Sequence, residues 1–212
     1  MAKIIKKAAD IAMQQLRRRF AQNDTRIRFQ LKDADAVLRR GLVWAMGEDA
    51  RWLPEYAEVA DWLSDNQGKG LLCMGDCGRG KTQITRDILP RIFNCYLRLA
   101  YNYCTAKQLK DEFDKMSRYK IICIDDIGTE AKVKSYGNTR DYIEDLVDQC
   151  EQDHKLLICS TNLTADELLQ RYDLRVFDRL KALCRRVVFE GDSMRDETNH
   201  KQYETILTHQ KD

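Results

Sequence analysis

Apolar residues along the chain recur with two spacings, and the spacing predicts which segments are strands and which are helices. Short, nearly unbroken apolar runs predict buried strands, at residues 71–74, 97–104, 121–124, 155–160 and 187–190. Apolar residues three or four positions apart predict helices, at about residues 1–22, 33–46, 54–65, 82–89, 105–116, 139–153, 165–172 and 175–183. Strands that alternate with helices are typical of a parallel sheet covered on both faces, so we expect a three-layer αβα fold.

Some helix starts carry a recognisable signal, with predicted caps at Asp33, Thr105 and Thr164 and a proline at position 54 in the first turn of its helix. Glu167 stands three residues after Thr164, which is the capping-box pattern. Residues 129–139 are polar and contain glycine, so they are predicted to form a mobile surface loop. The residues after 196 are polar and are predicted to form a loosely packed tail.

The strand at 71–74 leads into a glycine-rich segment that consists of Gly75, Asp76, Cys77, Gly78, Arg79, Gly80, Lys81 and Thr82. Its spacing is that of a P-loop, in which the glycines let successive N–H groups point into one concavity that holds anionic oxygens. Lys81 is the predicted cation for the β- and γ-phosphates, and Thr82 offers a hydroxyl to Mg²⁺. The pattern therefore predicts that ATP and Mg²⁺ bind here; an ordinary glycine-rich turn is the alternative.

Two acidic residues follow the apolar strand at 121–124, as expected of the companion strand of a P-loop. Asp125 is predicted to orient Mg²⁺ through water, and Asp126 to activate the attacking water. Because another strand lies between the P-loop and this one in the sequence, the two should flank a further strand in the sheet, as in the additional-strand ATPases. Asn162, at the tip of the strand at 155–160, is the predicted holder of the water or the γ-phosphate. The alternatives are a surface Asp-Asp turn and a plain turn residue.

Composition narrows the class of protein. The net charge is only +2, so the chain as a whole is not a polycation. No apolar run approaches the roughly 20 residues that are needed to cross a bilayer. Most of the eight cysteines lie in or next to predicted strands or helices, and none forms a C-x-x-C pair, so reduced thiols in a core and a cytoplasmic location are expected. These cysteines are Cys73, Cys95, Cys104, Cys123, Cys150, Cys159 and Cys184. The tryptophans Trp44, Trp52 and Trp62 are predicted to pack.

The first 28 residues hold eight lysines and arginines against two aspartates. A block this basic either contacts phosphate or an acidic partner, or forms a solvated helix face, and the sequence favours neither. The lysines and arginines proposed for DNA contact are Arg17, Arg18 and Arg19, with Lys132 and Lys134 in the predicted loop.

The motifs resemble a known family in their order along the chain. Besides the P-loop and Asp125–Asp126, they are Tyr136-Gly-Asn138, Ser160-Thr-Asn-Leu163, Arg175-Val-Phe-Asp-Arg-Leu180 and Gly191-Asp-Ser-Met-Arg195. This order resembles that of DnaC-like AAA+ helicase loaders over roughly residues 40 to 196. The IstB-like transposase helper ATPases share most of these motifs.

The resemblance implies roles for individual residues. Asp126 would be the catalytic base and Asn162 the sensor-1 residue. Arg179, or Arg175 beside it, would be a finger that reaches a neighbouring subunit's γ-phosphate, and Arg195 would be the sensor-2 arginine. Many AAA+ proteins have Glu where this chain has Asp126, so slow hydrolysis is expected.

The resemblance also implies an organisation and a function. We expect a basic helical extension (1–40), an AAA+ P-loop ATPase domain with a parallel sheet and a reduced lid (41–196), and a tail (197–212). The expected function is ATP-dependent loading of a replicative helicase onto single-stranded DNA, for a phage or mobile element, by a homo-oligomer that contacts no membrane. The alternatives are an IstB-like transposition helper and a nucleotide-gated adaptor that scarcely hydrolyses ATP.

Overall fold

Five parallel strands form the middle layer of the protein. The computed structural model describes residues 26–131, 133–135 and 138–194. The strands are β1 (Gly70–Gly75), β2 (Asn102–Thr105), β3 (Ile121–Asp125), β6 (Leu156–Thr161) and β7 (Cys184–Phe189). Their order in the sheet is β2-β3-β6-β1-β7, and every neighbouring pair is parallel. The P-loop strand β1 and the acidic strand β3 therefore flank β6, as the sequence predicted.

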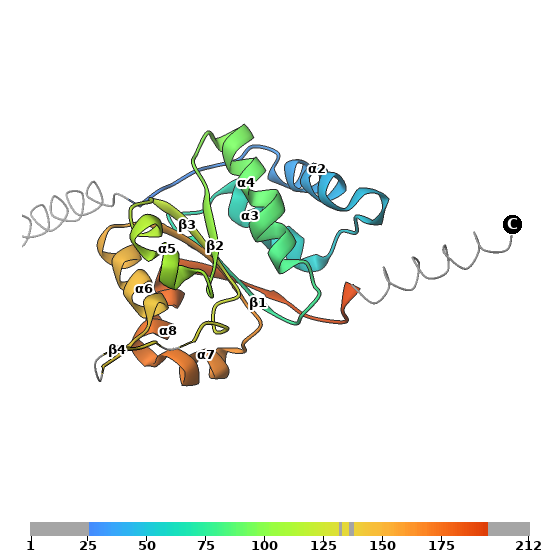
Figure 1. The fold of residues 1–212 in the computed structure, drawn as a ribbon. Helices are drawn as coiled ribbons and strands as arrows, with labels where there is room; N and C mark the ends of the chain where they lie inside the picture. The colour runs from blue at the N-terminus through green and yellow to red at the C-terminus, as the bar shows by residue number, and fades with distance from the viewer. Residues whose placement is uncertain (1–25, 132, 136–137, 195–212) are drawn as a thin grey trace, which may run out of the picture.

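Helices cover both faces of this sheet (Figure 1). On one face lie α2 (Ala34–Met46), α3 (Pro54–Ser64) and α4 (Leu89–Ile92), the last continuous with π-helical turns at Gln83–Ile88 and Phe93–Leu97. On the other lie α5 (Leu109–Met116), α6 (Tyr142–Gln152), α7 (Ala165–Tyr172) and α8 (Leu174–Leu183). The predicted three-layer αβα architecture is confirmed.

Alternation along β1 supplies both halves of the core, because successive side chains of a strand point to opposite faces. Leu71 and Cys73 pack with α2, α3 and the helix after the P-loop. Leu72 and Met74 pack with the layer formed by α5 to α8. Since both faces are covered, the strand reads as an unbroken apolar run in the sequence.

Several predicted boundaries hold. Pro54 begins α3, and α7 spans Ala165–Tyr172 with the Thr164–Glu167 capping box formed in both directions. Asp33 does not cap α2 as predicted: its backbone is left-handed (φ 54°), and its side chain makes no capping hydrogen bond. Thr105 lies outside α5, where its hydroxyl accepts a hydrogen bond from Gln108 N.

Two strand predictions were wrong at their starts. Leu97, predicted to begin a strand, ends the helix after the P-loop, and Arg98 follows in a left-handed conformation (φ 56°), so β2 begins only at Asn102. Strand β7 begins at Cys184, three residues before the prediction, because α8 passes into it without a loop. The adjacent residues Arg185 and Arg186 interrupt the apolar run there, so a search for apolar runs missed the start of the strand.

The segment predicted as a loop contains an antiparallel pair, β4 (Val133–Ser135) and β5 (Asn138–Arg140). A short turn element (Gly47–Asp49) also follows α2. The predicted helix at 1–22, Arg17 to Arg19, Lys132, Arg195 and the tail at 197–212 lie outside the described residues. Residue 40, the predicted domain boundary, falls inside α2, and Phe29 and Leu31 already belong to the core.

Cysteine and tryptophan predictions held in part. Six of the seven predicted core cysteines are buried as free thiols. Cys95 is exposed, because it lies on the solvent-facing side of its helical turn. Trp62 is fully buried, whereas Trp44 is about half exposed and lies under the Arg91 guanidinium, 3.2 Å from the ring centroid. No helix in the described part of the chain is long and apolar enough to cross a membrane.

Candidate functional site

The P-loop follows β1 and turns sharply around two glycines with positive φ. Gly75 has φ 123°, and a Cβ there would lie 2.2 Å from the carbonyl oxygen of Phe189 on β7. Gly80 has φ 86°, and a Cβ there would lie 2.5 Å from the Tyr56 hydroxyl oxygen. The loop can take this path only without side chains at these two positions.

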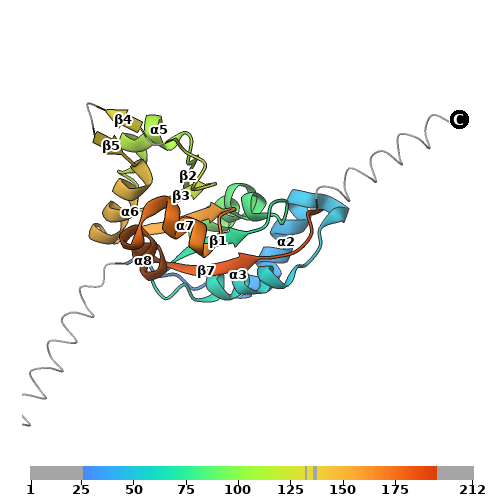
Figure 2. The ribbon, with the colours of Figure 1, turned by 90° about the horizontal axis from the view of Figure 1, so that it is seen from below.

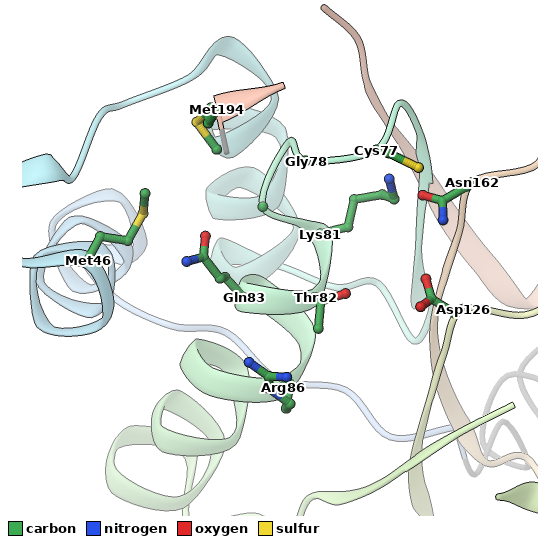
Figure 3. A pocket seen from close by; sticks show the side chains of 11 residues that line it. Met46, Cys77, Gly78, Lys81, Thr82, Gln83, Arg86, Asp126, Asn162 and Met194 are labelled. Atoms are coloured by element: carbon green, nitrogen blue, oxygen red, sulfur yellow. The ribbon is translucent and has the colours of Figure 1, made fainter. Parts of the chain in front are cut away.

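A cavity of about 570 Å³ opens at the carboxyl end of the sheet, where this loop meets the tips of β3 and β6. It is lined by Met46, Cys77, Gly78, Gly80, Lys81, Thr82, Gln83, Arg86, Asp126, Asn162 and Met194. In Figure 3 the side chains of Lys81, Asp126 and Asn162 surround the same space, and Met46 and Met194 lie at its far side. We call this space the P-loop cavity. Three separate sequence motifs therefore converge on one place.

Lys81 is held at the base of the P-loop with only 5% of its surface exposed. Its Nζ donates to the carbonyl oxygens of Gly75 (2.8 Å) and Asp76 (2.7 Å). Burial lowers the pKa of Lys81, while the nearby thiol of Cys77 and the carboxylate of Asp126 act in the opposite direction. A desolvated ammonium among carbonyl groups interacts strongly with an anion that enters the cavity.

Asp125 lies beneath the P-loop cavity and is almost completely buried. Its Oδ1 accepts hydrogen bonds from the hydroxyls of Thr85 (3.1 Å) and Ser160, and its Oδ2 accepts one from Tyr103 (3.0 Å). Burial, reinforced by the Asp125 charge, raises the pKa of Tyr103, so Tyr103 keeps its proton for this bond. Three hydroxyls thus fix both oxygens of the carboxylate.

Asp126, the next residue, faces the P-loop cavity and is half-buried. It takes the left-handed conformation (φ 58°), which is uncommon for a residue other than glycine. Its backbone N–H donates to Ser160 Oγ (2.9 Å), so the hydroxyl that donates to Asp125 also holds the backbone of Asp126. The turn between the two aspartates sends one side chain inward and the other into the cavity.

Asn162 follows β6 and reaches the P-loop cavity from the side opposite the P-loop helix. The strand end beneath it is fixed to the loop after Asp126, since Thr161 Oγ1 donates to the Ile127 carbonyl oxygen (2.8 Å) and Ile127 N to the Ser160 carbonyl oxygen (2.9 Å). Asp126 and Asn162 therefore lie on one rigid unit.

A second set of contacts holds the P-loop from outside. Arg79 forms an ion pair with Glu55 of α3 (2.7 Å) in which both side chains are largely buried, and it also donates to the Asp192 carbonyl oxygen (3.4 Å). Met194 N donates to the Gly78 carbonyl oxygen (3.1 Å), and Gly191 N to Asp76 Oδ2 (3.0 Å). The side chains of Arg79 and Asp76 thus fix the outside of the loop to α3 and to the segment after β7, and they do not point into the cavity.

Sequence reasoning missed four residues that line the P-loop cavity, namely Met46, Gln83, Arg86 and Met194. Gln83 and Arg86 lie one and four residues beyond the P-loop, so helical periodicity could have placed them beside it. Met46 ends α2 and Met194 lies after β7; only the tertiary fold brings them there.

The arginines expected to act on a neighbouring subunit lie elsewhere, on α8. Arg179, 19% exposed, pairs with Asp148 and with Glu151 (2.5 Å) of α6. Arg175, 65% exposed, pairs with Asp148 (3.0 Å). Neither lines the P-loop cavity in the described structure.

A glycine-rich loop between a parallel strand and a helix, with an acidic strand separated from it by one strand of the sheet, defines a P-loop protein of the αβα class. The chain matches no model of a protein family and no curated protein. Among solved structures, it resembles that of a DNA replication initiation factor with a TM-score of 0.50 at 12% identity, over 76% of this chain and 53% of that one.

Two helicase-loader structures are also similar to this chain. The DnaC helicase loader matches with a TM-score of 0.49 at 18% identity, over 76% of this chain and 93% of that one. DnaI matches with a TM-score of 0.49 at 17% identity, over 59% of this chain and 72% of that one. At these identities the likeness concerns the fold.

Proposed function

We propose that the chain binds ATP with Mg²⁺ in the P-loop cavity and hydrolyses it to ADP and phosphate. One observation carries this proposal: Lys81, Asp126 and Asn162, which come from three separate segments, face the same cavity of about 570 Å³. A cation, a carboxylate and an amide around a loop of backbone N–H groups are the groups that phosphoryl transfer to water needs.

Each group has one task in the proposed reaction. The loop N–H groups and Lys81 hold the β- and γ-phosphates. Asn162 orients a water whose oxygen attacks the γ-phosphorus while the bond to the β–γ bridging oxygen breaks, and Asp126 accepts the proton from that water. The negative charge that develops on the bridging oxygen stays on ADP.

The oxygen donors present fit Mg²⁺, which prefers hard oxygen ligands. The Thr82 hydroxyl lies at the P-loop cavity and would be a ligand of the metal. Asp125 lies beneath the cavity with both oxygens hydrogen-bonded, so it fixes the ends of β3 and β6 and would act on a bound metal through water and through its negative charge. Bound Mg²⁺ would neutralise charge on the phosphates.

We further propose that this ATPase serves DNA replication as a DnaC-like loader of a replicative helicase onto single-stranded DNA, acting as a homo-oligomer. The support is the ordered set of motifs, above all Arg175-Val-Phe-Asp-Arg-Leu180 and Gly191-Asp-Ser-Met-Arg195. The proposal that the partner is a helicase rests on this resemblance alone.

Turnover is proposed to be slow, for two reasons. Asp126 is one methylene shorter than the Glu of many AAA+ proteins, and the arginines proposed as fingers are paired within their own chain. A nucleotide-gated adaptor, which binds ATP and scarcely hydrolyses it, is the alternative that these observations favour.

The experiment measures ATP binding by calorimetry and phosphate release at steady state, with and without single-stranded or duplex DNA. Wild-type protein should bind ATP·Mg²⁺ and release phosphate, faster with single-stranded DNA. Lys81→Ala should bind ATP far more weakly and release no measurable phosphate, and Lys110→Ala, at an exposed position of α5, should match the wild type. Binding without measurable release under every condition would establish the adaptor, and stimulation by duplex DNA alone would favour the transposition helper.

A further inference from the structure

A second cavity, of about 460 Å³, lies between α7, α8 and the strands β1 and β7. We call it the edge groove. Its floor is aliphatic and is formed by Leu72, Met74, Leu168 and Leu180, and the partly buried ring of Phe177 stands beside them. Such a floor binds apolar groups, because removing apolar surface from water lowers the free energy.

The edge groove exists because the helical layer stops short of the last strand. Helix α8 ends at Leu183 and β7 begins at Cys184, so the chain turns directly from the helix into the strand. Figure 2 shows α8 at the start of β7 and the strand running on past it. On the α8 face of β7, Arg186 is exposed and Val188 only partly buried.

In the part of the chain that the structure describes, four cationic residues line the edge groove, three of them (Lys69, Lys181 and Arg186) have no carboxylate partner, and no carboxylate lines the groove. Arg185 pairs with Asp61 (2.7 Å), and Lys181 Nζ lies 5.3 Å from the centroid of the Phe177 ring. For Lys69 and Arg186, no acidic partner occurs among the described residues. An apolar depression within a positive rim is complementary to a ligand with an apolar centre and acidic flanks.

We propose that the edge groove is the docking surface for an acidic segment of a partner protein. The segment inserts a large apolar side chain over Leu72, Met74 and Leu180, and its aspartates or glutamates face Lys69, Lys181 and Arg186. This pattern of a buried apolar anchor within a charged rim is how short protein segments are recognised.

A protein segment fits the edge groove better than nucleic acid does. Single-stranded nucleic acid binds by stacking its bases on aromatic faces. The edge groove has one aromatic ring, Phe177, with the Lys181 ammonium over it, and its floor is aliphatic. The groove also reaches the amino ends of β1 and β7 at Lys69 and Cys184, whereas the P-loop cavity lies at their carboxyl ends. Docking therefore needs no vacant nucleotide site and is independent of the proposed ATPase.

The test begins with selection of a random library of short peptides against the full chain. Peptides that bind should combine a large apolar residue with neighbouring Asp or Glu. Their affinity, measured by fluorescence anisotropy, should fall about tenfold or more in the double variant Lys181→Glu, Arg186→Glu and in Phe177→Ala, and should weaken with added salt. Lys110→Glu, which reverses an exposed charge on α5, should bind within about twofold of the wild type.

Controls distinguish a variant that has lost the binding surface from one that no longer folds. Each variant must keep the wild-type unfolding midpoint and ATP affinity. If Phe177→Ala unfolds, the charge-reversal pair, whose side chains are exposed, decides alone. The proposal is overturned if selected peptides lack acidic residues, if none is enriched, or if folded groove variants bind them like the wild type. Loss of oligothymidylate binding without any enriched peptide would assign the groove to nucleic acid, and loss of self-association to a second copy; either result also overturns it.

Discussion

The P-loop cavity differs from the surface where α8 meets α6, which we call the α6–α8 surface and which consists of Arg175, Arg179, Asp148 and Glu151. Both carry residues with predicted roles in ATP hydrolysis, yet their polar groups have different hydrogen-bond partners. At the cavity, Asp125 is fixed by three hydroxyls and Lys81 by two loop carbonyls, so the arrangement is complete within one chain. On the α6–α8 surface, Arg175 and Arg179 are held by carboxylates, the groups that a phosphate would replace.

The difference teaches which parts can act alone. Buried hydrogen bonds to a charged group are costly to leave unmade, so the groups around the cavity hold their positions before any ligand arrives. An exposed ion pair contributes at most about 1 kcal/mol, so Arg175 can leave Asp148 for another anion at little cost. The α6–α8 surface is suited to exchange partners, and the cavity is suited to stay fixed.

The largest expected effect is at Lys81. Lys81→Ala removes the cation of the P-loop, and we expect ATP affinity to fall about a hundredfold, from the loss of roughly 3 kcal/mol in charge-assisted hydrogen bonds. Calorimetry measures this, with Lys110→Ala as the control. Unchanged affinity would falsify the assignment of the cavity to nucleotide.

Asp126 is expected to matter for turnover and not for binding. Asp126→Asn keeps the shape but accepts no proton, so phosphate release should fall about 10²- to 10⁴-fold while ATP still binds. Asp125→Asn changes a buried group that three hydroxyls hold, so it should disturb the fold of the site and the Mg²⁺ dependence instead. Wild-type turnover in Asp126→Asn would mean that the base is elsewhere.

Arg171 tests, through the free energy of unfolding, whether buried arginines contribute more to stability than exposed ones. Its guanidinium joins Glu130 (2.7 Å) and Asp141 (3.2 Å), and all three side chains are largely buried. Arg171→Ala strands two buried carboxylates, so the free energy of unfolding should fall by about 3 kcal/mol, against under about 1 kcal/mol for Arg175→Ala. Urea denaturation of the two variants measures both values. Equal losses would remove the distinction between buried and exposed arginines.

A smaller effect on the stability of the single chain is expected at Arg179, yet this residue decides whether the α6–α8 surface acts on a neighbour. Arg179→Ala should bind ATP normally and hydrolyse it more slowly than the wild type. It should lose less stability than Arg171→Ala, because its partners Asp148 (30% exposed) and Glu151 (41% exposed) can regain water when the guanidinium is removed. Mixed with Asp126→Asn, it should regain activity, because some interfaces then join an intact Asp126 to an intact Arg179. Mixed oligomers as inactive as either variant would leave Arg179 a purely structural role.

Sequence reasoning succeeded where a short stretch determines its own geometry. Gly75 and Gly80 specify the curl of the P-loop, Thr164 and Glu167 specify a helix start, and unbroken apolar runs specify strands buried on both faces. The motif order also implied that β6 lies between β1 and β3.

Other features depend on contacts between distant segments, which no local pattern records. Met46 and Met194 reach the P-loop cavity only through the packing of α2 and of the segment after β7. Ser160 reads as an ordinary strand residue, but it joins Asp125 to Asp126. The β4–β5 pair was missed because all its residues except Val133 are polar, so no apolar pattern marks it; the pairing of its backbones identifies it.

The strand order has a consequence for how the chain is made. Both neighbours of β1 come late in the sequence: β6 begins at Leu156, and β7 begins at Cys184, roughly 110 residues after β1. At about 5 to 20 residues per second, synthesis of that interval takes on the order of 5 to 20 seconds. The apolar run from Leu71 to Met74 leaves the ribosome before any strand that can pair with it. Folding of the sheet must therefore wait for nearly all of the domain, and the non-local pairing makes that folding slow.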